Sequence, residues 1–331
     1  MSFEQPLTPK ERPGCLPAPP DLELQREARI KLAAYQQQPH GDKAAKILDG
    51  FLDHLPNEGK QNIIPFIANC DDDEFLLTLS NHLQSAILIP LRARSAPEVT
   101  PSPPPDAEHG YEDIAADMIE PSSRSSQSSL KRQCFKRDNY RCMITGKYDK
   151  KYAPGNIANE IVTQTGKTEL VHILPFSLGK YRNSREEIRL IKIWEAIYTC
   201  FPAIRHHTNL SASKINDISN LMSLLGELHD AFGEFEVALE STSEENSYRL
   251  MIYRSFPTYM FHYLPPLLNE NNECIITFKQ FADFELPSQV LLNTHAAIAK
   301  ILHATGIAEI IENIFRDKRN YVALLQMEVR T

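Results

Sequence analysis

Two short apolar segments that carry polar side chains at defined positions constrain the fold of this chain most strongly. Residues 168–176 form an apolar run bounded by a glycine and a proline, which is typical of a mostly buried strand, and His172 lies near its end. Residues 219–233 read as a short strand that passes into a short helix, which the final glycine can terminate. Nine positions separate Asn220, at the start of this strand, from His229 on the helix. The sequence therefore predicts two strands and a helix that present two imidazoles and an amide.

This set resembles the HNH endonuclease superfamily, which has a ββα-metal fold, and is similar in particular to the fungal HNH nuclease domain-containing proteins. In those members a Cys-x-x-Thr-Gly segment precedes the first histidine, and residues 142–146 here read Cys-Met-Ile-Thr-Gly. The resemblance covers roughly residues 131–260. It implies an α+β protein with a ββα-metal core, helical insertions and a C-terminal extension. It also implies a divalent-metal-dependent endonuclease that hydrolyses phosphodiester bonds in DNA.

The residue types in the motif suit that chemistry. The unperturbed pKa of histidine, about 6.5, allows His172 to act as the general base that activates water. A base needs an acceptor for its other ring N–H, and Asn220 is the candidate through its amide oxygen. His229 would bind the metal as a neutral imidazole, with Mg²⁺ or Mn²⁺ favoured and Zn²⁺ or Ni²⁺ open. The structural alternatives are a buried core histidine, a capping asparagine and a surface histidine.

The chain departs from the family pattern at the second metal ligand. Many members have Asp or His immediately before the first histidine, where this chain has Val171, which cannot bind a cation. Glu169 is the nearest carboxylate and is assigned as the second ligand, although strand alternation would point it away from the face of His172. The alternative is a catalytically degenerate HNH-fold module that binds nucleic acid or another protein.

The charge of the chain is concentrated in one segment. The whole chain carries a net charge of −8, whereas residues 131–185 hold 12 Lys or Arg against 4 Asp or Glu, a net of +8. This block includes the first motif strand, which favours contacts with DNA phosphates over its alternatives, a solvated surface or a localisation signal. The candidate phosphate contacts are Lys131, Arg132, Lys136, Arg137, Arg141, Lys147, Lys150, Lys151, Lys180 and Arg182.

The cysteines and apolar runs bear on metal content and location. The six cysteines form no Cys-x-x-Cys pair, so the sequence predicts no zinc ribbon, and Cys142 is expected to be a small buried residue. We expect no disulfide framework, no signal peptide and no transmembrane segment. An intracellular protein, nuclear or cytoplasmic, is the expectation.

Composition divides the chain into five parts. Residues 1–20 are rich in proline and predict a disordered tail, and residues 95–130 predict a Pro/Ser-rich linker. Residues 21–94 predict helices that Pro39, Pro56 and Pro65 interrupt, forming either a small bundle or a docking surface for a protein partner. Residues 131–262 form the HNH nuclease-like domain, and residues 263–331 form a C-terminal extension packed on it.

Further elements are predicted around the motif. Ser184 with Glu187 is a capping box for a helix to about Cys200, whose apolar residues, including Ile188 and Trp194, are available for burial. Segments 235–240 and 248–254 predict a hairpin, and residues 288–306 predict an amphipathic helix. His206 and His207 are expected to be exposed loop residues with only an outside chance of binding metal.

Overall fold

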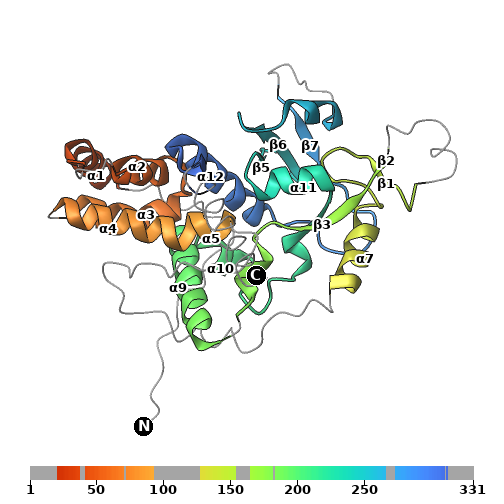
Figure 1. The fold of residues 1–331 in the computed structure, drawn as a ribbon, viewed down its shortest axis with the longest axis horizontal. Coiled ribbons are helices and arrows are strands. Elements are labelled where there is room, and N and C mark those ends of the chain that lie inside the picture. The colour runs from red at the N-terminus through yellow and green to blue at the C-terminus, as the bar shows by residue number, and fades with distance from the viewer. Residues whose placement is uncertain are drawn as a thin grey trace, which may run out of the picture.

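The computed structural model describes residues 21–37, 42–70, 72–92, 127–153, 165–181, 183–265, 273–309 and 311. The predicted tail, most of the predicted linker, and Arg182 lie outside these residues. The described part mixes helices with three small sheets, which confirms the α+β class. The helices of the N-terminal segment lie at one end and the strands at the other, with α12 between them (Figure 1).

The N-terminal segment is helical, as predicted. Asp21 and Asp72 cap two of its helices by accepting hydrogen bonds from backbone N–H groups of the first turn. Pro56 precedes the first residue of a helix and separates two helices as expected, whereas Pro65 lies inside a helix that continues to Ala68, so its predicted interruption is wrong. The elements are α1 (Leu22–Ala34), α2 (Ala44–His54), α3 (Asn57–Ala68), α4 (Asp73–Leu83), the π-helix η1 (Gln84–Leu88) and α5 (Ile89–Arg92).

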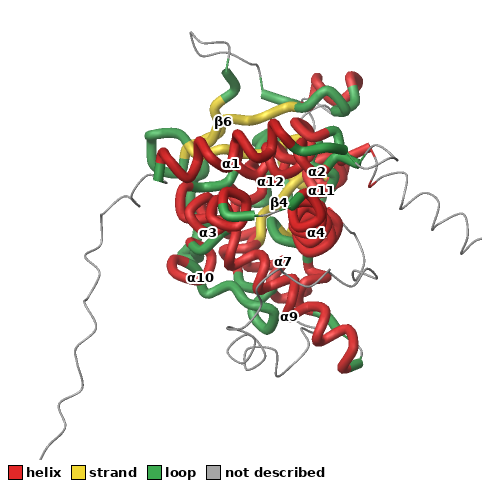
Figure 2. Tube along the Cα trace, turned by 90° about the vertical axis from the view of Figure 1, so that its left-hand side faces the viewer, coloured by secondary structure: helices red, strands yellow, loops and turns green. Residues whose placement is uncertain are grey.

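The N-terminal helices pack on other parts of the same chain, α9 (Ser184–Cys200) and α12 (Gln289–Thr305). A Cβ added at Gly59 would lie 1.9 Å from the carbonyl oxygen of Cys200, so glycine allows α3 to approach the end of α9. Gly50 allows a similar approach of α2 to Thr305. In Figure 2 these helices face the viewer with α12 behind them. The predicted alternatives for this segment are a small bundle or a docking surface for a protein partner. The structure shows these helices packed within the chain.

The N-cap of helix α9 lies one residue earlier than predicted. The side chain of Asn183 accepts the backbone N–H of Glu186 at 3.0 Å, so Asn183 replaces Ser184 as the cap. Asparagine is at least as good a helix cap as serine, and either fits the local sequence. Trp194 is fully buried and donates its ring N–H to the carbonyl of Leu178, as its predicted burial requires, but Ile188 is 55% exposed.

The strands form three small sheets. A parallel pair joins β1 (Tyr148–Asp149) to β2 (Thr165–Gly166), and an antiparallel pair joins β3 (Thr168–His172) to β4 (Leu221–Leu225). The predicted hairpin is confirmed as β5 (Val237–Ser241) and β6 (Ser247–Ile252), and β7 (Ile275–Thr277) adds a third strand.

Helix α12 is central to the fold. It packs on α2 on one side and on β5 on another, and every residue from Thr294 to Ala299 is buried. Its partly or fully exposed residues Gln289, Asn293, Lys300 and Ala304 are spaced 4, 7 and 4 positions apart and lie on one face, so the helix is amphipathic as predicted. Its end is as predicted, because Gly306 takes the left-handed conformation with φ of 65°. No helix among the described residues is long and apolar enough to cross a membrane.

Candidate active site

The two motif strands and the motif helix lie together. His172 is the last residue of β3 and pairs with Leu221, the first residue of β4. Helix α11 (Gly226–Gly233) follows β4 directly and packs on both strands. The predicted strands and helix are confirmed, although the left-handed residue that follows α11 is Phe235, with φ of 60°, and not its final glycine. This arrangement brings His172 and His229 to neighbouring elements.

His172 is oriented by an asparagine that the sequence did not identify. Oδ1 of Asn216 lies 3.0 Å from Nε2 of His172, so the ring donates its Nε2–H and Nδ1 keeps its lone pair. Among the described residues, Nδ1 has no hydrogen-bond partner. The ring also packs on Phe176, with centroids 5.2 Å apart. The contact that we expected from Asn220 therefore comes from Asn216.

The environment of His172 keeps its ring neutral at neutral pH. Burial lowers the pKa of His172 below its ordinary value, the hydrogen bond to Asn216 acts in the opposite direction, and the charge of His229 lowers it further. An unprotonated Nδ1 can accept a proton.

Asn220 has a structural role. Its Oδ1 accepts the backbone N–H of Leu174 at 2.9 Å, and its Nδ2 donates to the carbonyls of Leu174 and Ile215 at 3.1 and 2.9 Å. The side chain is fully buried. Asn220 thus ties the backbone after β3 to the backbone before β4. These bonds fix the residues next to His172 and Asn216, and the side chain of Asn220 does not contact the imidazole.

Glu169, three residues before His172 on β3, forms a pair with His229 on α11. Oε2 of Glu169 lies 3.0 Å from Nδ1 of His229, and Oε1 lies 2.6 Å from Nζ of Lys167. Lys167 first and His229 second lower the pKa of Glu169, so the carboxylate is charged at neutral pH. Glu169 is partly exposed on β3, and its contact with His229 shows that it faces α11.

The donors present fit a loosely held divalent cation. Glu169 and His229 supply one oxygen-donor and one nitrogen-donor side chain that are 31% and 38% exposed, which leaves room for water and a substrate phosphate. The described residues contain no group of three His, Cys, Asp or Glu side chains that could hold a metal, so a closed structural zinc site does not fit. Val171 is buried in the core, and His206 and His207 are exposed at the end of α10 (Ala203–His207).

Arg137 does not face solvent, which corrects its assignment as a phosphate contact. It lies at the end of α7 (Gln127–Arg137), is fully buried, and pairs with Asp138 at 2.7 Å. Its remaining donors bond the carbonyls of Ile218, Leu221 and Glu285 at 2.8 to 3.1 Å. Because all five donors are used internally, Arg137 joins α7 to the start of β4 and to the C-terminal segment.

The other basic candidates lie nearer the surface. Arg132, Lys136, Lys150 and Lys151 are exposed. Arg141 is partly buried against the ring of Tyr148 and bonds its hydroxyl. Three lysines lie over aromatic rings, with the nitrogen 4.3 to 5.1 Å from the centroid: Lys131 over Phe135, Lys147 over Tyr263 and Lys180 over Phe176.

The Cys142–Gly146 segment forms a tight turn beside β4. The N–H of Gly146 donates to the carbonyl of Cys142 at 2.9 Å, and Gly146 has φ of 70°, which glycine adopts without strain. The N–H of Met143 donates to the carbonyl of Ser223 on β4. Cys142 is buried, as predicted.

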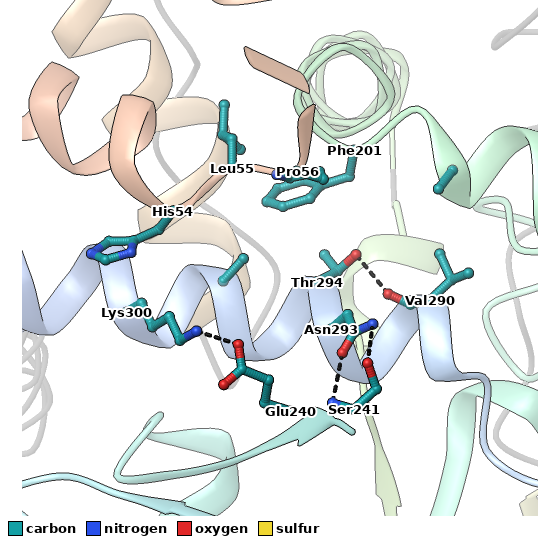
Figure 3. A pocket seen from close by; sticks show the side chains of 12 residues that line it. His54, Leu55, Pro56, Phe201, Glu240, Ser241, Val290, Asn293, Thr294 and Lys300 are labelled. Atoms are coloured by element: carbon teal, nitrogen blue, oxygen red, sulfur yellow. Dashed lines mark hydrogen bonds and ion pairs between the residues drawn. The ribbon is translucent and has the colours of Figure 1, made fainter. Parts of the chain in front are cut away.

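A pocket of about 330 Å³ lies elsewhere, where α2, α12 and β5 meet (Figure 3). Its polar side chains satisfy one another, since Lys300 pairs with Glu240, and Asn293 bonds both the backbone N–H and the hydroxyl of Ser241. None of the motif residues lines it. The pocket does not present a set of polar groups aimed at a ligand, in contrast to the motif site.

One comparison with known proteins matches the part of the chain that contains the motif. Residues 142–240 match a protein family described as HNH endonuclease, and this span begins at the Cys142 turn and contains all three motif residues. No curated protein and no solved structure matches the chain. The match supports the HNH superfamily for this part of the chain, and HNH endonuclease domains use a divalent metal and act on nucleic acids.

Proposed function

We propose that this protein is a divalent-metal-dependent HNH-type endonuclease that hydrolyses phosphodiester bonds in DNA. We propose that β3, β4 and α11 form its ββα-metal core, and the likeness of the Cys142–Gly146 segment to the fungal members supports a relation to them. One observation carries the proposal: His172 has a free Nδ1 fixed by Asn216, and the same strand carries Glu169, whose charged carboxylate contacts His229. A neutral, half-buried base on the same strand as a carboxylate–imidazole pair suits the activation of water near a phosphate.

In this mechanism His172 acts as the general base. Its Nδ1 takes a proton from water as the water oxygen attacks the phosphorus and the leaving oxygen departs. Asn216 holds the Nε2–H, which keeps the ring in the tautomer that can accept the proton and stabilises the imidazolium that forms. Asn220 holds the backbone that carries both residues.

His229, with Glu169, would hold the cation. A divalent ion bound there would supply positive charge to the phosphate and to the leaving oxygen. Glu169 can serve as a second ligand, or it can accept the Nδ1–H of His229 so that Nε2 of His229 points to the ion. Hard ions such as Mg²⁺ and Mn²⁺ suit so few protein ligands, and Zn²⁺ and Ni²⁺ remain alternatives.

The exposed basic residues complete the proposal. Arg132 and Lys136 on α7, with Lys150 and Lys151 after β1, would contact DNA phosphates and fix the strand near the site. We place the protein inside the cell, in the nucleus or cytoplasm, where such a substrate occurs.

The test is cleavage of supercoiled plasmid by the full chain with Mg²⁺, Mn²⁺, Zn²⁺ or Ni²⁺, and with EDTA as the control. We expect nicked product with Mg²⁺ or Mn²⁺ and none with EDTA. The second candidate is a degenerate HNH module, which the small number of metal donors among the described residues favours. DNA binding without cleavage in any of the four metals would establish that alternative and overturn the nuclease.

A further inference from the structure

Three aromatic rings cluster at the end of α7, outside the motif. The rings of Tyr140 and Tyr152 are stacked, with centroids 4.5 Å apart and planes at 26°. Phe135 meets both edge-on, at 6.4 and 6.1 Å. Phe135 is buried, whereas Tyr152 is 49% exposed. The outermost ring of the cluster is therefore supported from within and open to solvent.

The backbone fixes these rings in place. Asn139 and Tyr140 both have positive φ values, 52° and 55°, which are uncommon for residues other than glycine. The N–H of Tyr140 donates to the carbonyl of Phe135, and the carbonyl of Tyr140 accepts the N–H of Asp149, both at 2.7 Å. The N–H of Tyr152 donates to the carbonyl of Asp149 at 3.0 Å. The platform is thus ordered before any ligand arrives, which lowers the entropy cost of binding.

The segment that carries the rings exposes cations, and its two acidic residues are buried. Asp138 and Asp149 are the acidic residues of segment 127–153, and both are buried. Arg132, Lys136, Lys150 and Lys151 of the same segment are exposed, and Lys131 lies over the ring of Phe135. A solvent-open aromatic ring within a cationic surface is the combination that binds single-stranded nucleic acid, because bases stack on the ring while phosphates meet the cations.

The cluster is tied directly to the strand that carries the site. Oδ2 of Asp149 accepts the backbone N–H of Thr168, the first residue of β3, at 2.9 Å. The N–H of Lys150 donates to the carbonyl of Gly166. Glu169 follows Thr168 on β3, so the platform lies next to the end of β3 at which the Glu169–His229 pair is placed.

We infer that Tyr152, supported by Tyr140 and Phe135, is a stacking site for an unpaired base of a DNA strand. The inference rests on the proposed function and specifies its substrate class: a DNA strand with unpaired bases next to the bond to be cleaved. Lys150 and Lys151 contact the phosphates that flank the stacked base.

The test measures binding separately from cleavage. Fluorescence anisotropy measures the binding of a labelled oligothymidylate, and of a blunt duplex of the same length, to the full chain. The chain carries His172→Ala and the buffer contains EDTA, so that no DNA is cleaved. We expect the single strand to bind more tightly than the duplex, and Tyr152→Ala to weaken single-strand binding about 10-fold. Tyr152→Phe keeps the ring and should keep the affinity. Tyr259→Ala, which removes a 65% exposed tyrosine from a different element, is the matched control and should have no effect.

A second variant reports the stacking itself. Tyr152→Trp adds an exposed indole to a chain whose one tryptophan, Trp194, is fully buried. Any quenching of tryptophan fluorescence by oligothymidylate therefore originates at position 152. Quenching that saturates with binding supports the platform. Unchanged affinity of Tyr152→Ala, or binding of Tyr152→Trp without quenching, overturns it. If the protein cleaves DNA but does not stack a base on Tyr152, the stacking inference is wrong and the nuclease proposal stands. If it stacks a base but cleaves in none of the four metals, the nuclease proposal is wrong and the stacking site stands.

Discussion

Oδ1 of Asn216 lies 3.0 Å from Nε2 of His172, and this contact leaves Nδ1 as the nitrogen that can take a proton from water. The residue that orients the proposed base is thus in the loop before β4 and four positions before the asparagine of the motif. Each feature of the site leads to a separate measurement.

Asn216→Ala should lower the nicking rate about 10- to 100-fold, because the ring loses its fixed tautomer. The hydrogen bond to Asn216 raises the pKa of His172, so its loss should also shift the acidic limb of the pH–rate profile to lower pH. Asn216→Asp keeps an acceptor and adds a negative charge, and should shift the limb to higher pH. A profile that does not move in either variant would show that Asn216 does not position the base.

Glu169→Gln should raise the concentration of Mn²⁺ needed for half-maximal nicking about 10- to 100-fold, as expected for a ligand or for a residue that orients a ligand. Glu227→Gln is the control, because Glu227 is exposed on the same helix as His229 and should leave the metal requirement unchanged. An equal metal requirement in the parent protein and Glu169→Gln would remove Glu169 from the cation site.

Arg137→Met should destabilise the fold by about 3–5 kcal/mol, because it leaves Asp138 as an uncompensated buried charge. Lys136→Met is the matched control at the neighbouring exposed position and should change the free energy of unfolding by less than about 0.5 kcal/mol. Urea unfolding measures both. The structural role assigned to Arg137 fails if the two variants are equally stable.

The sequence predicted the local elements of the site better than its contacts. Each of β3, β4 and α11 follows from a local signal, an apolar run with turn residues close to its ends. Arg137 sits in a run of basic residues that indicates a surface, and it is buried because carbonyls from Ile218 and Glu285, distant in sequence, converge on it.

Asn216 could not be predicted for a related reason. Its place beside His172 depends on how Asn220 closes the loop between Ile215 and β4, and no local pattern encodes that closure. The cap of α9 shows the smaller error of one residue that is usual where two capping residues are adjacent.

His295 should make the fold sensitive to acid. Its ring is fully buried, stacks on Phe232 and Phe235 with centroids 3.8 and 4.3 Å apart, and has its pKa lowered by burial to about 3. Between this value and about 6.5 the unfolded chain binds a proton that the folded chain excludes. Stability that is present above pH 6.5 is therefore lost as the pH falls, by about 2 kcal/mol between pH 7 and pH 5.

The test of this sensitivity is urea unfolding of the parent chain and His295→Phe at both pH values. The variant should lose about 2 kcal/mol less than the parent on acidification, because it keeps the aromatic stack and has no proton to bind. Other histidines with lowered pKa values, such as His303, contribute equally to both chains. An identical loss in the two chains would mean that His295 does not exclude the proton.

The central claim is that His172 is the base of a nuclease site, and the most direct measurement is plasmid nicking by the parent chain and by His172→Ala in Mn²⁺. The free energies of unfolding of the two chains in urea should agree within about 1 kcal/mol, because His172 lies at a strand end and is partly exposed. The account predicts a loss of at least about 100-fold in nicking rate for His172→Ala. A variant that folds normally and nicks at the parent rate would contradict it.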